Sequence, residues 1–300
     1  MKNLKRLSRH FSLLKEKFTT DGLGHMLKEL SFVTEDFEVM PVLFVGHGSP
    51  MNIISENSYT RDLSRAAMEL PKPKAIMVIS AHWLTSGTCV GCMDKPRTIY
   101  DFYGFPDELY KIRYPCKGAP ELANLAINVV KSVNVKCDSQ WGLDHASWAV
   151  LKHMYPKADV PVFEMSLDYS PYNDWKPKSM EYHYKLASEL LPLRKKGVLI
   201  LGSGNIVHNL GLIDFDTYSK PFPWAVKFDE KVKACLQNKN HGALLNYLEL
   251  GQEARYAAPT LDHYLPMIYV LGLQQKDEQI KFIHEGFQNG SVSMRAFEIS

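Results

Sequence analysis

Three histidines follow segments that the sequence predicts to be buried strands. His47 comes directly after the apolar run 41–45, His82 closes a second apolar run, and His208 lies a little beyond a further one. In open α/β sheets the loops at the carboxyl ends of the strands converge on one crevice, so these side chains can meet although they are distant in sequence. Neutral imidazole binds zinc, iron, copper and nickel. The pattern therefore predicts a transition-metal site, with the identity of the metal left open.

Two further histidines each follow an aspartate, in the pairs Asp144-His145 and Asp262-His263. A neighbouring carboxylate can fix the orientation of an imidazole or raise its basicity. Aspartate is also a common N-cap, and both pairs stand where a helix is expected to begin. The two roles are compatible, and the sequence does not choose between them.

Apolar runs predict the strands that must position these histidines. The buried strands are expected over residues 41–45, 75–79, 160–167 and 197–201. Helix-spaced leucines, alanines and charges predict helices over residues 61–70, 119–133, 145–155 and 180–194. This β-α-β-α order favours a mainly parallel sheet. Near the end of the chain, Asn289-Gly290 between the runs 280–284 and 291–297 predicts an antiparallel hairpin.

The predicted fold class is α/β: a single domain with a mainly parallel, mixed central sheet flanked by helices and an antiparallel C-terminal hairpin. A chain of 300 residues, 45% apolar and 23% charged, suits one large domain of this kind. Residues 1–38 differ, because lysines and arginines crowd their first half between leucines and phenylalanine. We predict a basic helical extension over 1–38 and the α/β domain over 39–300. The extension lacks the continuous apolar core of a secretory signal.

Charge and cysteine content narrow the class of partner. The formal net charge of +2 is close to balance, which argues against nucleic acid and favours a small molecule. No stretch approaches the roughly 20 apolar residues that span a bilayer. The five cysteines are too scattered for a disulfide framework, and Cys89 and Cys92 stand in a predicted strand rather than at the helix start of a redox motif. These features predict a cytoplasmic protein.

Six segments, in order from about residue 40 to the end, resemble the DOPA 4,5-dioxygenase type of class III extradiol ring-cleavage enzymes. They are Gly46-His-Gly-Ser-Pro-Met51, Ser80-Ala-His-Trp83, Tyr100-Asp-Phe-Tyr-Gly-Phe-Pro106, Gly142-Leu-Asp-His-Ala-Ser-Trp148, Gly202-Ser-Gly-Asn-Ile-Val-His208 and His263-Tyr-Leu-Pro266. The chain departs from that pattern at Ala146, where the family commonly has glycine. The basic extension has no counterpart in the family core.

The resemblance implies metal ligands at His47, His82 and His263. It implies that His208 is either a fourth ligand or an acid/base residue beside the metal, and that His145 is the second acid/base histidine. Relatives such as protocatechuate 4,5-dioxygenase use two histidines and a carboxylate around ferrous iron. A site of histidines alone suits Zn²⁺ at least as well as Fe²⁺, although Fe²⁺ is expected for dioxygenase activity because zinc has no redox chemistry.

The substrates implied by the resemblance are a catechol and O₂, and the product is a ring-opened semialdehyde. Trp83, Tyr103 and Phe105 are candidates for a wall around the substrate ring, although each also suits the hydrophobic core. The histidines taken alone permit two other functions, a zinc-dependent hydrolase and a zinc-stabilised metal-binding protein. A homo-oligomer is compatible with the sequence, which does not specify the natural substrate.

Overall fold

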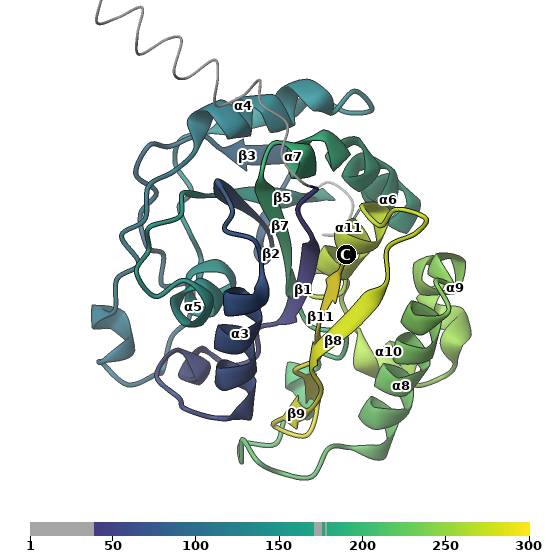
Figure 1. Ribbon diagram of the computed structural model, residues 1–300. Helices are drawn as coiled ribbons and strands as arrows, with labels where there is room; N and C mark the ends of the chain where they lie inside the picture. The colour runs from purple at the N-terminus through teal and green to yellow at the C-terminus, as the bar shows by residue number, and fades with distance from the viewer. Residues whose placement is uncertain (1–38, 171–175, 178) are drawn as a thin grey trace, which may run out of the picture.

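The apolar runs of the sequence form the inner strands of one mixed sheet (Figure 1). β1 (Val42–Gly46), β7 (Val198–Gly204), β2 (Ala75–Thr85) and β5 (Val162–Ser170) lie side by side in that order and pair in parallel. Such strands are buried on both faces, which is the environment that continuous runs of Val, Ile and Leu require. The computed structural model describes residues 39–170, 176–177 and 179–300, so the predicted extension 1–38 lies outside the described residues.

Antiparallel pairs extend the sheet on both sides. Next to β1 lies β11 (Ala296–Ile299), followed by β8 (Ile280–His284), and both pairings are antiparallel. Beyond β5 lie β3 (Thr88–Gly91), which is antiparallel to β5, and β4 (Val135–Asp138). The strand order is β4-β3-β5-β2-β7-β1-β11-β8, and the short β6 (Lys176–Pro177) pairs with β5. The predicted fold class is confirmed.

The C-terminal hairpin has a stem and a separate tip. The stem is the pair β8 and β11, whereas the tip pairs β9 (Phe287–Gln288) with β10 (Val292–Ser293). Asn289 and Gly290 connect the tip strands with positive φ angles of 54° and 69°. The loop between the paired residues Gln288 and Val292 is three residues long, and asparagine and glycine adopt such positive φ angles more readily than other residues.

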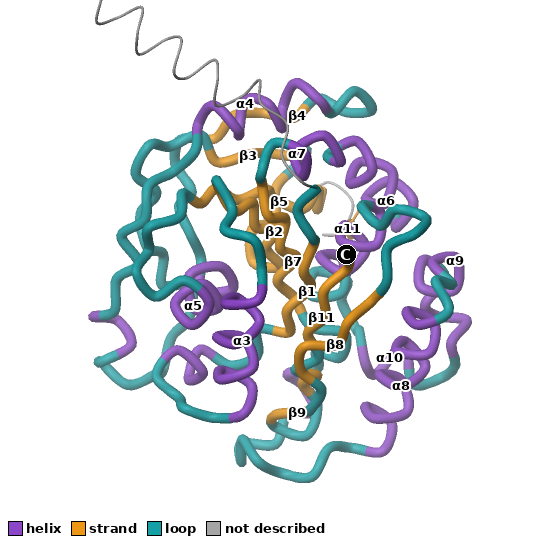
Figure 2. The backbone as a smooth tube through the Cα atoms, in the orientation of Figure 1, coloured by secondary structure: helices purple, strands orange, loops and turns teal. Residues whose placement is uncertain are grey.

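Helices cover both faces of the sheet, and each face has its own hydrophobic cluster (Figure 2). In β1, Val42 and Phe44 point into one cluster, while Leu43 and Val45 point into the other, as strand alternation requires. The α-helices are α3 (Ser58–Glu69), α4 (Pro120–Val129), α5 (His145–Met154), α6 (Met180–Glu189), α7 (Leu191–Lys195), α8 (Pro223–Gln237), α9 (His241–Leu245), α10 (Ala254–Ala257) and α11 (Leu265–Gly272). Short 3₁₀ helices are η1 (Pro50–Ile53), η2 (Leu109–Lys111), η4 (Leu210–Leu212) and η5 (Tyr247–Leu250).

The single helix predicted over 180–194 is two helices, α6 and α7, which meet at Leu190. Pro192 explains the break, because a proline inside a helix removes one backbone donor and clashes with the preceding turn. The predicted helix 61–70 begins earlier, at Ser58, where the Asn57 side chain accepts the Thr60 N–H. Within the described ranges, every helix is too short or too polar to traverse a lipid bilayer.

The cysteines differ from the sequence expectation. Cys92, just after β3, forms a disulfide with Cys137 of the adjacent β4, and their Cα atoms are 5.7 Å apart. Cys89, Cys116 and Cys235 are free. Sequence spacing drew attention to Cys89 and Cys92, but pairing of β3 with β4 brings Cys137 to Cys92 instead.

Candidate metal centre

His47, His82 and His263 meet at one end of the inner strands. His47 directly follows β1, and His263 lies in the turn before α11. His82 lies inside β2, which is longer than predicted, at a place where the register with β5 shifts. Each of the three ring centroids is 5.1 Å from the other two. The structure thus brings together the three histidines that the resemblance implies as ligands.

Two glycines of β7 allow the His263 turn to approach the sheet. A Cβ at Gly204 would lie 2.2 Å from the carbonyl oxygen of His263, and a Cβ at Gly202 would lie 2.5 Å from that of Pro266. The Asn205 N–H donates to the same His263 carbonyl at 2.8 Å. The Gly202-Ser-Gly204 sequence therefore holds the third histidine beside the other two.

Each of these three imidazoles has its Nδ1 atom engaged on the side away from the centre. His47 Nδ1 lies 3.1 Å from Ser203 Oγ, His82 Nδ1 lies 2.7 Å from Asp101 Oδ2, and His263 Nδ1 contacts Asp262 Oδ2. The Nε2 atoms remain available for a metal ion, which is the usual arrangement of histidine ligands with outer partners.

The spacing of the donor atoms fits a metal ion. His47 Nε2 and His82 Nε2 are 3.3 Å apart. Two nitrogens about 2.0–2.1 Å from a tetrahedral metal are separated by about 3.3–3.4 Å. Donor atoms of all three histidines lie within 4.8 Å of one another. The residues therefore fit a divalent cation bound by imidazole.

Burial and nearby carboxylates set the charge of the cluster. Burial lowers the pKa of His47 well below its usual range, and burial also lowers the pKa of His263. These imidazoles are thus neutral and able to bind a metal. Burial opposes protonation of His82 too, but its contact with Asp101 raises its pKa overall. Although burial opposes ionisation of Asp101, the His145 and His82 contacts hold the pKa of this carboxyl low.

His145 stands beside the three histidines at the first turn of α5. Its ring centroid lies 4.3 Å from that of His82 and 5.5 Å from that of His47. Asp144 caps the helix by accepting the Ser147 N–H, so the cap interpretation is confirmed for this aspartate. Asp262 behaves differently: α11 begins only at Leu265, and the Asp262 carboxylate contacts the His263 ring instead.

His208 stacks face to face on His263. The ring centroids are 3.4 Å apart and the planes are 8° from parallel. The residue lies beyond the end of β7, where it forms an isolated antiparallel β-bridge with Val292. Burial, followed by the nearby His263, lowers the pKa of His208 well below its usual range.

The three aromatic candidates lie in different surroundings. Trp83 is 3% exposed and stacks on Trp141 with the rings parallel, so it belongs to the packed interior. Tyr103 is 92% exposed. Phe105 is half-buried and packs edge-on against Phe102, whose ring is 5.5 Å from that of His145.

Sequence reasoning assigned no role to Asp101 and Ser203, although both contact the histidine cluster. Ser203 Oγ also donates to the carbonyl of Ala146, so it joins the start of α5 to His47. Both residues stand inside segments that carry the family resemblance, and this was the available signal. Ala146, the departure from the family pattern, is fully buried.

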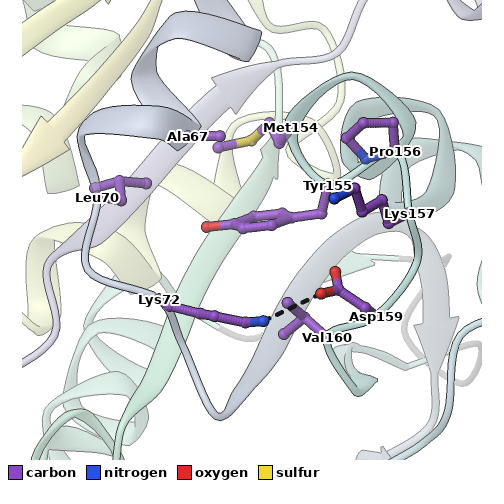
Figure 3. A pocket seen from close by; sticks show the side chains of 9 residues that line it. All are labelled: Ala67, Leu70, Lys72, Met154, Tyr155, Pro156, Lys157, Asp159 and Val160. Carbon is purple, nitrogen blue, oxygen red and sulfur yellow. Dashed lines mark hydrogen bonds and ion pairs between the residues drawn. The ribbon is translucent and has the colours of Figure 1, made fainter.

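Hollows elsewhere on the surface do not contain this cluster. One of about 280 Å³ lies between the ends of α3 and α5, with Tyr155 across it and a Lys72–Asp159 ion pair of 3.1 Å at its rim (Figure 3). Another, of about 600 Å³, has His153 as its single histidine. Neither offers a set of metal-binding side chains, so the histidine cluster is the candidate site.

Comparisons with known proteins identify the family to which the chain belongs. Residues 40–296 match the family described as the catalytic LigB subunit of aromatic ring-opening dioxygenase. The 4,5-DOPA dioxygenase extradiol of Escherichia coli (strain K12) is 43% identical over 264 residues, which cover 87% of this chain and 94% of that protein. The Beta vulgaris protein of the same name is 34% identical over 270 residues, covering 87% and 97%.

A solved structure supports the same assignment. The crystal structure of an uncharacterized Escherichia coli K12 protein has a TM-score of 0.74 and 40% identity, and the match covers 87% of this chain and all of that one. The chain belongs to the LigB family of aromatic ring-opening dioxygenases. Within it, the chain is similar to proteins named 4,5-DOPA dioxygenase extradiol. The extradiol dioxygenase assignment is confirmed, and the hydrolase and zinc-stabilised alternatives are not favoured.

Proposed function

We propose that the chain uses O₂ to open the ring of a catechol such as DOPA at a non-haem metal held by His47, His82 and His263. The observation that carries this proposal is the triangle of the three imidazoles, each 5.1 Å from the others. Their Nδ1 atoms are engaged elsewhere, so their Nε2 atoms can hold one face of a metal ion. The relatives' names supply the substrate class.

Fe²⁺ is the metal that we propose for catalysis. When bound, it would bring the catechol and O₂ together and let electron density pass from the ring to oxygen. Zn²⁺ suits the same imidazoles but cannot change its oxidation state. A zinc-filled protein would therefore be folded and inactive.

His208 serves in proton transfer rather than as a fourth ligand. An imidazole lone pair lies in the plane of its ring, and the His208 and His263 planes are nearly parallel with centroids 3.4 Å apart. Two stacked rings direct their lone pairs in separate parallel planes, so these two lone pairs do not converge on one point. The stack therefore supports an acid/base role for His208 beside the substrate.

His145 is the second proposed acid/base residue. Its Nδ1 is held by Asp101 at 3.0 Å, which leaves Nε2 to exchange a proton with the catechol. Burial lowers the pKa of His145, so the imidazole is neutral and able to accept the first hydroxyl proton. The same group can return the proton when the ring opens.

The three aromatic candidates have two different proposed roles, contact with the substrate and packing behind the site. We propose that exposed Tyr103 and half-buried Phe105 contact the substrate ring at the opening of the site. Trp83 supports the site from the packed interior, where it is stacked on Trp141 next to His82.

We also propose that residues 39–300 form the catalytic domain, preceded by the basic extension. Exposed Leu210, Leu212 and Phe215 in the segment after His208 support a homo-oligomer, which light scattering would test. We propose a cytoplasmic location, which the three free cysteines support and in which the Cys92–Cys137 pair would be reduced.

Oxygen uptake tests the proposed function. The metal-free protein is loaded anaerobically with Fe²⁺ or Zn²⁺ and mixed with DOPA or simple catechols. Uptake and a yellow ring-opened product are expected in the iron sample alone. His82→Ala should abolish both, whereas His284→Ala, which alters a histidine paired with Asp62 outside the cluster, should not. No uptake with any catechol, although iron is demonstrably bound, would exclude this substrate class.

A further inference from the structure

One carboxylate, Asp101, contacts two histidines of the cluster at once. Its Oδ2 atom is 2.7 Å from His82 Nδ1 and 3.0 Å from His145 Nδ1. Its Oδ1 atom accepts the backbone N–H of His145 at 2.8 Å. The same side chain therefore touches a proposed metal ligand and a proposed acid/base residue.

The loop that carries Asp101 is anchored to α5, to the segment before α5 and to the segment after η2. The Trp148 indole donates to the Ile99 carbonyl at 2.8 Å, and the Ile99 N–H donates to the Leu143 carbonyl at 2.8 Å. Tyr100 Oη donates to the Ile112 carbonyl at 2.6 Å. These bonds place the Asp101 carboxylate with little freedom, as required of a group that orients others.

An ionised carboxylate only accepts hydrogen bonds. Both Nδ1 atoms at Oδ2 must therefore carry hydrogen, so each of the two imidazoles, when neutral, has an unprotonated Nε2. For His82, that is the form that binds a metal. For His145, that is the form that accepts a proton from a substrate hydroxyl.

We propose that Asp101 is a positioning residue that sets the tautomers of His82 and His145 together. It thereby links metal binding to proton transfer through one side chain. The catalytic part of this inference rests on the proposed function, whereas the tautomer part does not.

Asparagine at this position cannot keep all three contacts. If the amide oxygen faces the rings, the NH₂ group meets the donating backbone N–H of His145. If the amide is reversed, its NH₂ group faces both Nδ1 atoms and favours the opposite tautomer, with hydrogen on Nε2. Either orientation of Asp101→Asn weakens the arrangement, whereas Asp101→Glu retains a carboxylate.

The first experiment reads the tautomers directly. Long-range ¹H–¹⁵N spectra of the metal-free, ¹⁵N-histidine-labelled protein at pH 8 distinguish hydrogen on Nδ1 from hydrogen on Nε2. Wild type is expected to show Nδ1–H for His82 and His145, and Asp101→Asn to lose it at one or both. Hydrogen on Nε2 of either residue in wild type would overturn the proposal, even if the variant does not fold.

The second experiment compares Asp101→Asn with Asp262→Asn, because Asp262 contacts the His263 imidazole but not His145. Fe²⁺ affinity is measured by chelator competition. The values of kcat and KM are then measured at saturating iron. Both variants should bind iron about 10–100-fold more weakly. Asp262 also lies beside His208, so Asp262→Asn is the control for iron affinity only. Asp101→Asn should in addition lose kcat at saturating iron, by about 10²-fold with little change in KM, because it disturbs His145 as well as a proposed ligand.

Two further variants complete the test. Asp62→Asn breaks an aspartate–histidine pair outside the cluster and should match wild type in both iron affinity and kcat. The kcat of Asp101→Glu should be at least tenfold higher than that of Asp101→Asn. The proposed link between metal binding and proton transfer would be overturned if Asp101→Asn kept the wild-type kcat at saturating iron. It would also be overturned if the kcat of Asp101→Glu were no higher than that of Asp101→Asn. If wild type turns over no catechol, the proposed function fails, while the tautomer and affinity results still decide the role of Asp101.

Discussion

A single methyl group at Gly204 should disturb the metal centre without altering any proposed ligand. A Cβ there would lie 2.2 Å from the His263 carbonyl oxygen, whereas Cβ contacts under 3.0 Å are essentially never found. The strand and the His263 turn must therefore separate by about 0.8 Å in Gly204→Ala, because a packed interior has no free space to absorb the clash. Overpacking of this kind costs about 1–3 kcal/mol in the free energy of unfolding. A displacement near 1 Å can lower a rate by about 10²-fold.

Calorimetry and chelator competition would measure these effects. Gly204→Ala should lower Tm by about 2–5 °C, bind Fe²⁺ more weakly, and turn over more slowly. Gly91→Ala is the matched control, because a Cβ in that strand meets no atom closer than 3.7 Å. If Gly204→Ala keeps the wild-type Tm and iron affinity, the close approach of β7 to His263 does not hold the ligand in place.

Three other predictions concern metal, pH and the mouth of the site. Removal of the metal by a chelator should abolish activity, and Fe²⁺ should restore it. Iron at 100 times Kd should raise the free energy of unfolding by about 2.7 kcal/mol. A Tm that does not change with iron would contradict this stabilisation. Burial lowers the pKa of His183 to about 3. Because the unfolded imidazole titrates near 6.5, stability falls as pH drops from 6.5 towards 3, by about 2 kcal/mol between pH 7 and 5. His183→Gln, which can still contact the Tyr269 hydroxyl, should remove this difference between the free energies of unfolding at pH 7 and pH 5, as measured by urea unfolding. A pH dependence equal to that of wild type would refute the prediction. Tyr103→Ala should leave Tm unchanged and raise KM several-fold without lowering kcat, because the side chain is exposed; an unchanged KM would remove Tyr103 from the substrate site.

Much of the fold follows from local patterns in the sequence. The run before His47 is apolar at every position, which indicates burial on both faces, and β1 lies in the middle of the sheet with that burial. Asn289-Gly290 specifies its own turn through two positive φ angles. These predictions succeeded because neighbouring residues determine them.

Features that depend on distant neighbours could not be predicted in the same way. The extension of β2 through His82 requires the shifted pairing with β5, which the apolar run 75–79 does not reveal. Cys92 meets Cys137 only because β3 and β4 are adjacent. Asp101 belongs to no helix or strand, so its meeting with two imidazoles is visible only in three dimensions.

The meeting of three histidines from separate parts of the chain has a consequence for how the protein matures. His47 follows β1 and His82 lies in β2, both near the start of the described domain, whereas His263 precedes α11 near its end. Partly assembled states therefore offer at most two of the three imidazoles in place, and tight metal capture must wait until β7 and the α11 turn have docked. Metal uptake would then report completion of the native fold, and a chain stalled before that step would leave the metal ion unbound.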